Sequence, residues 1–237
     1  MSEQMMPKEE FFEALKAARQ PVHSGGHPFS AAWKNGELTR DQLGAWATQQ
    51  YYYINIVAQM FAALYARLPD LDARQHMLEN IIGEETPGQR HPDILLKFAK
   101  ACGRDPERIK NAYMNGEVLP ATLGMQAWVW QLATHAHLCE SAAGIMVALE
   151  GQTPTIYPPY IEAGLKMGFS DDDLEFFHVH IEADIEHEIH GLEICHRYAT
   201  TAELQGRAIA TVTNSGRMRY NMLTDIWNST HLDQAAE

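Results

Sequence analysis

The stretch FFHVHIEADIEHEIHGL, residues 176–192, concentrates four histidines and a run of carboxylates. Apolar residues recur through it and no proline or glycine interrupts it before Gly191, so the pattern predicts a helix. At about 100° per residue, His180, Asp184 and His187 fall within roughly 60° of one another on one helix face. A second set of polar side chains points away from this face: His178, Glu182 and Glu186.

Two interpretations of the His180–Asp184–His187 face remain open at this point. Dense charge is the usual mark of a solvated helix. However, this face carries no lysine or arginine that would form surface ion pairs, and Phe176 and Phe177 lie near it, which indicates burial. Two imidazoles and a carboxylate are ligand types that suit iron, manganese or zinc, and a bundle core can build such a site from facing helices.

Helical spacing recurs through the rest of the chain, and almost no segment alternates as a strand does. The sequence therefore predicts an all-α bundle of about seven to nine helices, in a single domain over residues 1–237 with a disordered N-terminus over residues 1–9. Helical structure is expected to be interrupted at Tyr157-Pro158-Pro159. The expected helices cover residues 7–19, 28–33, 40–68, 70–85, 91–101, a short segment from 106, 120–150, the His-rich stretch after a cap at 170–173, and 202–228.

Composition narrows the class of protein. The chain has 237 residues, 46% of them hydrophobic, and a formal net charge of −13, which disfavours partners such as nucleic acid or an anionic membrane. Its three cysteines are widely spaced and form no CxxC pair, as expected in a reducing compartment. No apolar run resembles a signal peptide or a membrane span, so a cytoplasmic location is expected.

Further metal ligands must come from other helices. Glu84 and His91 flank a Pro-Gly break, and Glu150 ends an apolar run in which a lone carboxylate is costly without a partner or a metal. Taken separately, each has an ordinary explanation as a helix-end acid or a helix cap. Together with the His-rich stretch they supply three carboxylates and three histidines, which suits a dinuclear iron or manganese site. Glu85 is the alternative to Glu84, and Glu140 the alternative to Glu150.

At these positions the chain resembles the haem-oxygenase-like diiron oxidases and oxygenases, over about residues 10–230. The resemblance is carried by HPFSAAWKNGELTRDQLGAWATQQYYYINI (27–56), ENIIGEETPGQRHPDILLKF (79–98), ALEGQTPTI (148–156) and the His-rich stretch. The family pattern is a glutamate and, after six intervening residues, a histidine, then a mid-chain glutamate, then His-x3-Asp-x2-His. It implies six catalytic metal ligands here: Glu84, His91, Glu150, His180, Asp184 and His187.

The chain also departs from individual branches of this family. The pyrroloquinoline-quinone synthase-like branch works without metal and lacks the ligands of the last ligand helix, which are present here. The chlamydial death-domain-associating branch makes p-aminobenzoate from a tyrosine of its own, which by position is Ser30 here, and uses a lysine that by position is Tyr160. The thiaminase-like branch uses a cysteine nucleophile; Cys139 is the candidate, with a small core residue as the alternative.

The resemblance implies a non-haem diiron, O2-dependent oxidoreductase that holds two Fe(II) ions, with Mn as an alternative in one site. Its substrate would be an amine, an amino acid or a carboxylic acid in a biosynthetic pathway, and a homodimer is expected. Three alternatives stay open: a metal-independent oxidase, a self-sacrificing p-aminobenzoate synthase-like protein, and a metal-binding or partner-binding protein without catalysis.

Several residues are candidates for the surroundings of the site. Aromatic residues that are expected to line a cavity, or else to pack in the core, are Trp46, Tyr51, Tyr52, Tyr53, Tyr157, Tyr160 and Phe176. Arg40 and Arg90 are candidates for binding a substrate carboxylate, with a surface role as the alternative. Met218, Met222 and Trp227 give the last helix an apolar face that would serve either a dimer contact or the core.

Overall fold

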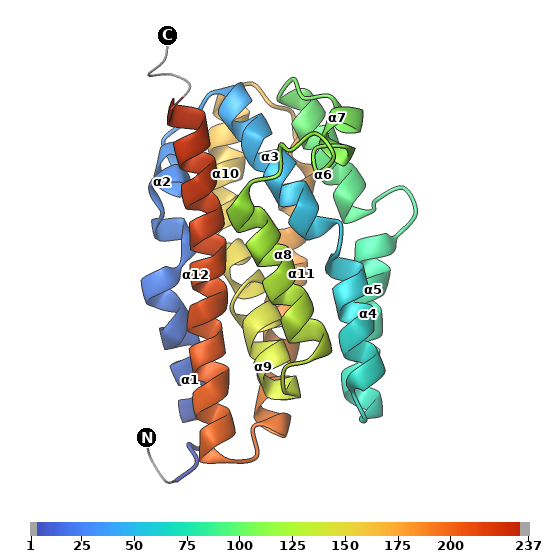
Figure 1. Ribbon diagram of the computed structural model, residues 1–237, viewed down its shortest axis with the longest axis vertical. Helices are drawn as coiled ribbons and strands as arrows, with labels where there is room; N and C mark the ends of the chain where they lie inside the picture. The colour runs from blue at the N-terminus through green and yellow to red at the C-terminus, as the bar shows by residue number, and fades with distance from the viewer. Residues whose placement is uncertain (1–3, 233–237) are drawn as a thin grey trace.

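The computed structural model describes residues 4–232, which fold into an all-α bundle with the long helix α12 along one side (Figure 1). The all-α prediction is confirmed. The helices are α1 Lys8–Arg19, α2 Pro28–Lys34, α3 Arg40–Ile54, α4 Val57–Arg67, α5 Leu71–Glu85, α6 His91–Ala101, α7 Pro106–Lys110, α8 Pro120–Thr134, α9 Leu138–Ala142, α10 Thr153–Lys166, α11 Glu175–Tyr198 and α12 Ala202–Leu232.

Local signals fix most helix ends where the sequence predicts them. The Thr39 hydroxyl accepts from the Gln42 backbone N–H at 3.2 Å and forms a capping box at the start of α3. The Asp105 carboxylate accepts from the Glu107 N–H at 3.0 Å and caps α7. The bonds of Thr39 and Asp105 satisfy backbone donors that a helix start leaves free. The Ser170 hydroxyl accepts from the Asp173 N–H at 3.1 Å, but this bond closes a separate turn: α11 starts at Glu175 with Leu174 at its N-cap and no side-chain cap bond, so the cap expected at 170–173 is wrong.

The long helix that was expected over residues 40–68 is wrong, because the chain breaks between α3 and α4. The Ile56 N–H donates to the Tyr53 carbonyl at 3.2 Å, a bond one residue shorter than the helical one. The break falls in Ile54-Asn55-Ile56-Val57, where β-branched residues and asparagine have low helix propensity. It lets α3 and α4 present Tyr53 and Val57 to the same interior cavity.

The long helix expected over residues 120–150 is also wrong. Helix α8 ends at Thr134, and the chain restarts at His137, whose N–H donates to the Glu140 carboxylate at 3.1 Å. A π-helical turn, η3 (Ala143–Val147), then follows α9, and a 3₁₀ turn, η4 (Glu150–Gln152), leads into α10. The 3₁₀ turn lies where the expected helix ends, whereas the break after α8 and the π-helical turn were not predicted. Every residue of η3 is buried and apolar, which removes the helical periodicity that could mark that turn.

The expected interruption at Tyr157-Pro158-Pro159 is wrong as well, since α10 continues through both prolines. Each proline removes a backbone donor, yet its fixed φ suits a helix. One face of α10 is buried and includes Tyr157, Tyr160 and Ile161. Packing of that face holds the helix together despite the lost bonds.

The N-terminal segment is attached to the start of α12. The Met6 N–H donates to the Gln205 side chain at 2.7 Å, and α1 already includes Lys8. The prediction of a disordered N-terminus therefore fails for residues 8–9, and residues 1–3 lie outside the described part. Met222 is 1% exposed in the core, so it is not part of an outward apolar face.

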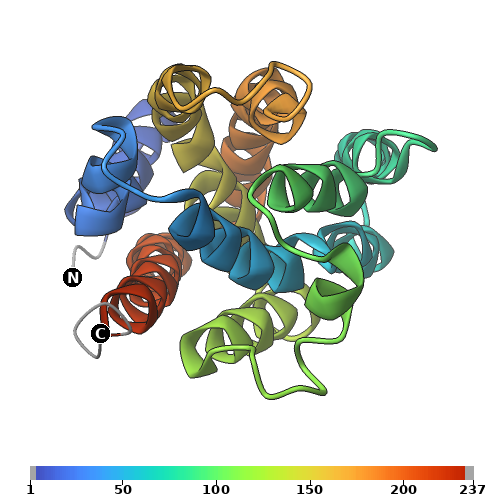
Figure 2. The ribbon, with the colours of Figure 1, turned by 90° about the horizontal axis from the view of Figure 1, so that it is seen from above.

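The core positions the His-rich helix in the interior. Helix α11 packs against α10, α9 and η3, and Figure 2 shows α3 passing through the middle of the bundle between α12 and the α4–α5 pair. Phe176 and Phe177 are fully buried, as the sequence predicts. Among the described residues, no helix is both long enough and apolar enough to cross a membrane.

Candidate metal centre

Two buried clusters, each with three ionisable side chains, lie in the interior of the bundle. Within each cluster the candidate ligand atoms lie within 4.8 Å of one another. The first cluster is Glu84, His91 and His180, and the second is Glu150, Asp184 and His187. The structure therefore brings together all six residues that the sequence singled out, and α11 contributes to both clusters.

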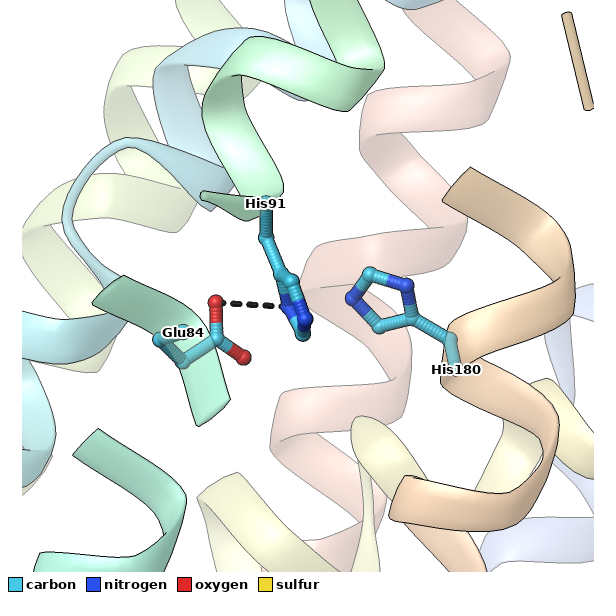
Figure 3. A group of neighbouring side chains, drawn as sticks. All are labelled: Glu84, His91 and His180. Carbon is cyan, nitrogen blue, oxygen red and sulfur yellow. Dashed lines mark ion pairs between the residues drawn. The ribbon is translucent and has the colours of Figure 1, made fainter. Parts of the chain in front are cut away.

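The first cluster forms where α5 ends and α6 begins (Figure 3). Glu84 lies in the last turn of α5 and His91 is the first residue of α6. Between them Gly88 has a φ of +86°, a conformation that favours glycine and reverses the chain. His91 Nδ1 lies 2.9 Å from Glu84 Oε2, and the ring centroids of His91 and His180 are 4.3 Å apart.

The second cluster forms where the π-helical turn η3 meets α11. The Ala148 N–H donates to the Ala143 carbonyl at 2.9 Å, the wide turn typical of π-helix, and Glu150 follows it. Such turns inside helical segments occur frequently at functional sites. His187 Nδ1 lies 3.3 Å from Glu150 Oε2 and 3.4 Å from Asp184 Oδ1. The shift in helical register thus carries Glu150 to the two ligands from α11.

Neighbouring groups orient two of the six side chains. His180 Nδ1 lies 2.6 Å from the Phe176 carbonyl oxygen. A carbonyl only accepts, so Nδ1 carries the proton and Nε2 is left as the free ligand atom. The Thr153 hydroxyl donates to Asp184 Oδ2 and leaves Oδ1 toward His187. These contacts come from the backbone of α11 and from the start of α10.

Four of the candidate ligand atoms are buried without a hydrogen bond: Glu84 Oε2, His91 Nδ1, Glu150 Oε2 and His187 Nδ1. The carboxylate and imidazole atoms approach each other, yet they are not aligned as donor and acceptor. Buried polar atoms are nearly always satisfied, so this many in one place requires an explanation. A pair of metal ions would satisfy them, and three carboxylates and three imidazoles are a donor set that suits divalent iron or manganese.

Burial and mutual charge set the protonation of the clusters. Burial raises the pKa of Glu150 to about 7, against the opposing charge of His187. Burial lowers the pKa of His187, but the Glu150 and Asp184 carboxylates outweigh it and raise the pKa to about 10. Burial, followed by the charge of His91, lowers the pKa of His180. His180 is therefore neutral at pH 7, whereas His187 carries a proton that a metal ion would displace.

A small cavity adjoins both clusters. Centres of water-sized molecules have about 20 Å³ of space in it. Its walls come from six helices and from η4: Gln50, Tyr53, Ile54, Val57, Glu84, Glu150, Thr153, Tyr157, His180, Asp184 and Arg219. Among the described residues, Gln50 and Arg219 are lining groups that the sequence reading missed. A buried arginine far along the last helix carries no local pattern that would single it out.

The alternative ligands lie elsewhere. Glu85 is exposed and pairs with Arg90 at 2.6 Å, which also explains why Arg90 lies on the surface. Glu140 pairs with Arg207 at 2.6 Å. Arg40 is exposed and donates to the carbonyls of Ala101 and Met167. None of these side chains lines the cavity. Arg40 and Arg90 are surface groups, which is the alternative that the sequence favoured for both.

The aromatic candidates divide into lining and packing residues. Tyr53 and Tyr157 line the cavity. The Tyr52 hydroxyl instead donates to the Ile109 carbonyl at 3.0 Å, and Trp46 and Phe176 pack in the aromatic core. Cys139 is fully buried, and burial raises the pKa of its thiol to about 11, which does not suit a nucleophile.

A family model and several related proteins place this chain in one family. The family described as "iron-containing redox enzyme", of the haem-oxygenase type, matches residues 44–220. The 4-aminobenzoate synthase of Nitrosomonas europaea is 31% identical over 84% of this chain and 84% of its own length. That of Chlamydia muridarum is 32% identical over 75% and 74%. The pyrroloquinoline-quinone synthase of Pseudomonas entomophila is 28% identical over 86% and 80%.

Solved structures support the fold independently. A TenA homologue from Pseudomonas syringae pv. tomato superposes with a TM-score of 0.80, covering 96% of this chain and 99% of that one, at 18% identity. A domain with a haem-oxygenase-like fold from Shewanella denitrificans superposes with a TM-score of 0.78, covering 99% and 97%, also at 18% identity. At this identity the likeness concerns the fold alone, and it confirms the predicted haem-oxygenase-like bundle.

Proposed function

Because this chain belongs to the family of iron-containing redox enzymes with a haem-oxygenase-like fold, we propose that it is a non-haem diiron oxidase or oxygenase acting on a small molecule. One observation carries the proposal: two adjoining buried triads, Glu84/His91/His180 and Glu150/Asp184/His187, whose ligand atoms converge and include four atoms without a hydrogen bond. Two ferrous ions bound there would supply the electrons for reducing dioxygen. Manganese in one of the two sites is an alternative that metal analysis distinguishes.

The residues of the chain have separate tasks in this proposal. The three carboxylates offset most of the charge of two divalent ions, and the Phe176 carbonyl holds His180 with Nε2 facing its cluster. Tyr53 and Tyr157 line the cavity wall, and burial raises the pKa of both phenols further above neutral, so both carry a proton that a ligand could accept. Ile54 and Val57 add an apolar wall that keeps bulk water away.

We expect the centre to oxidise an external substrate and not a side chain of the protein. The reason lies in the region that, in the self-sacrificing synthases, supplies the tyrosine that is consumed. By position, Ser30 and Tyr160 replace the two residues that self-sacrificing chemistry needs. The Tyr160 hydroxyl donates to Ser30 Oγ at 2.6 Å, both residues are buried, and the Tyr160 ring stacks on Trp33 at 4.1 Å. We propose that this pair has become part of the core.

The test is anaerobic reconstitution with ferrous iron, followed by a count of iron bound per chain. We expect two irons in the wild-type protein and, on mixing with oxygen, a transient visible absorption band. Asp184→Ala and His180→Gln should lose iron and the band. His178→Gln is the matched control, because His178 lies on the same helix but its side chain is 44% exposed.

Three results would contradict the proposal. They are a wild-type protein that binds no iron, Asp184→Ala and His180→Gln variants that retain it, or an iron-loaded protein that does not consume oxygen with any amine, amino acid or carboxylic acid. The first result would favour a metal-independent oxidase of the pyrroloquinoline-quinone synthase type. The last, with iron bound, would favour a metal-binding protein without catalysis.

A further inference from the structure

Arg219 is a buried cation whose role the metal centre does not explain. It lies on α12, is 7% exposed, and donates one N–H to the Leu149 carbonyl at 3.0 Å. Among the described residues, no carboxylate lies within ion-pair distance of it. A guanidinium has five N–H donors, and a buried charge without a direct counter-ion is destabilising. The Leu149 carbonyl and the neighbouring Tyr157 hydroxyl use part of this donor set, and the remaining N–H groups of Arg219 are available to a ligand.

The guanidinium lines the same cavity as Glu84, Glu150 and Asp184. One explanation is that it balances those carboxylates from a distance. That explanation fails once the centre is loaded, because three carboxylates and two divalent ions leave one positive charge and Arg219 raises it to two. A loaded cavity with this balance attracts an anion.

Two further donors face the cavity without protein partners. Gln50 is 2% exposed and Tyr53 is 5% exposed, and both line the cavity beside Arg219. Neither side chain makes a hydrogen bond within the described part of the chain. An amide and a phenol buried without partners are costly unless a ligand completes them. Together with the guanidinium they match the oxygens of a carboxylate.

We infer that Arg219, assisted by Gln50 and Tyr53, binds the carboxylate group of the substrate and holds the rest of it beside the six-ligand centre. The inference rests on the proposed function and narrows its substrate to an acid or an amino acid, excluding simple amines. The apolar walls Ile54 and Val57 would contact the carbon chain. The small free space indicates a short substrate.

The binding test uses the full chain loaded with Zn(II), which replaces iron without redox chemistry. Isothermal titration calorimetry measures the affinity for butyrate, for the matched neutral probe butyramide, for butylamine and for inorganic phosphate. Wild-type protein should bind butyrate at least about tenfold more tightly than butyramide or butylamine. Phosphate binding more tightly than butyrate would overturn the carboxylate assignment, and so would an absence of butyrate binding.

Variants of Arg219 distinguish butyrate that binds the guanidinium from butyrate that binds the metal directly. Arg219→Gln should weaken butyrate binding by about tenfold and leave butyramide unchanged, Arg219→Lys should recover part of the loss, and Gln50→Leu should weaken it by about threefold. Arg217→Gln is the matched control, since Arg217 is exposed on the same helix. Butyrate affinity within twofold of wild type in both Arg219→Lys and Gln50→Leu would overturn the inference. This comparison remains valid if Arg219→Gln fails to fold.

Zinc and iron content, measured separately for each variant, distinguish this inference from the proposed function. If metal content is normal and butyrate binding does not depend on Arg219, the inference is wrong and the proposed metal centre stands. Butyrate binding that depends on Arg219 in a protein without metal would support the carboxylate subsite and contradict the diiron proposal.

Discussion

At the scale of single residues, the candidate centre depends on groups that hold the ligands as much as on the ligands. The Thr153 hydroxyl donates to Asp184 from the first residue of α10, and the Phe176 carbonyl fixes the tautomer of His180. Such contacts restrict the ligand to the orientation that a metal ion needs.

Thr153→Val should weaken metal binding at the second cluster by about tenfold, because loss of a partner that orients a ligand typically lowers affinity by ~10- to 100-fold. Competition with a coloured chelator measures the affinity. Thr155→Val is the matched control, since its hydroxyl donates to the Gln152 carbonyl at 2.9 Å and contacts no ligand. Equal affinities in the two variants would show that Thr153 does not orient Asp184.

Metal affinity should rise with pH. The metal-free protein holds a proton on His187, whose pKa is raised to about 10, and a metal ion must displace it, so protons compete with the metal at neutral pH. The Zn(II) association constant should increase at least about tenfold per pH unit between about pH 6 and 8, with a proton released on binding. Calorimetry in buffers of different ionisation enthalpy measures that release. A flat pH profile would be inconsistent with a protonated His187.

At the scale of elements, close packing between α11 and η3 sets the distance between Glu150 and the ligands of α11. Gly191 makes this approach possible, because a Cβ there would lie 2.5 Å from the Met146 Cβ. Glycine is thus required in the interior of α11 despite its low helix propensity.

Gly191→Ala should destabilise the protein by about 1–3 kcal/mol, the usual range for overpacking, and should weaken metal binding by moving α11 away from η3. Gly206→Ala is the matched control: nothing lies near a Cβ at that helical position, so it should gain about 0.5–1 kcal/mol. Urea unfolding measures both changes. Destabilisation of the two variants by the same amount would refute the packing explanation.

At the scale of the whole molecule, three carboxylates buried in one interior region oppose folding when no metal is present. Glu84, Glu150 and Asp184 are each less than one-tenth exposed. Burial of like charges is destabilising, and metal binding to the folded state reverses it by mass action. Stability and metal binding therefore make opposite demands on these positions.

Glu84→Gln should stabilise the metal-free protein by about 1 kcal/mol, which raises its midpoint of thermal unfolding. It should also reduce the increase in that midpoint that Zn(II) binding produces. Glu85→Gln is the matched control, since Glu85 is exposed beside Arg90 and its change should stay within about 0.5 kcal/mol. Differential scanning fluorimetry with and without Zn(II) measures both. A lower midpoint for metal-free Glu84→Gln would contradict the charge argument.

The sequence by itself determined the all-α class and the face of α11 that carries His180, Asp184 and His187, and its resemblance to a family implied the other three candidate ligands. Each of these depends on local spacing or on a short motif, and helix geometry converts such spacing into a face. The family pattern already preferred Glu84 to Glu85 and Glu150 to Glu140, and the tertiary structure adds the physical difference: Glu84 and Glu150 are buried in the clusters, whereas Glu85 and Glu140 pair with arginines elsewhere.

Only the tertiary structure decided where the helices break and what lines the cavity. The α3–α4 break, the π-helical turn before Glu150 and the passage of α10 through two prolines depend on packing, which overrides local propensity. Gln50 and Arg219 come to the site from α3 and α12, which are far apart in the sequence. No local pattern brings such residues together, since their meeting depends on the folding of the whole bundle.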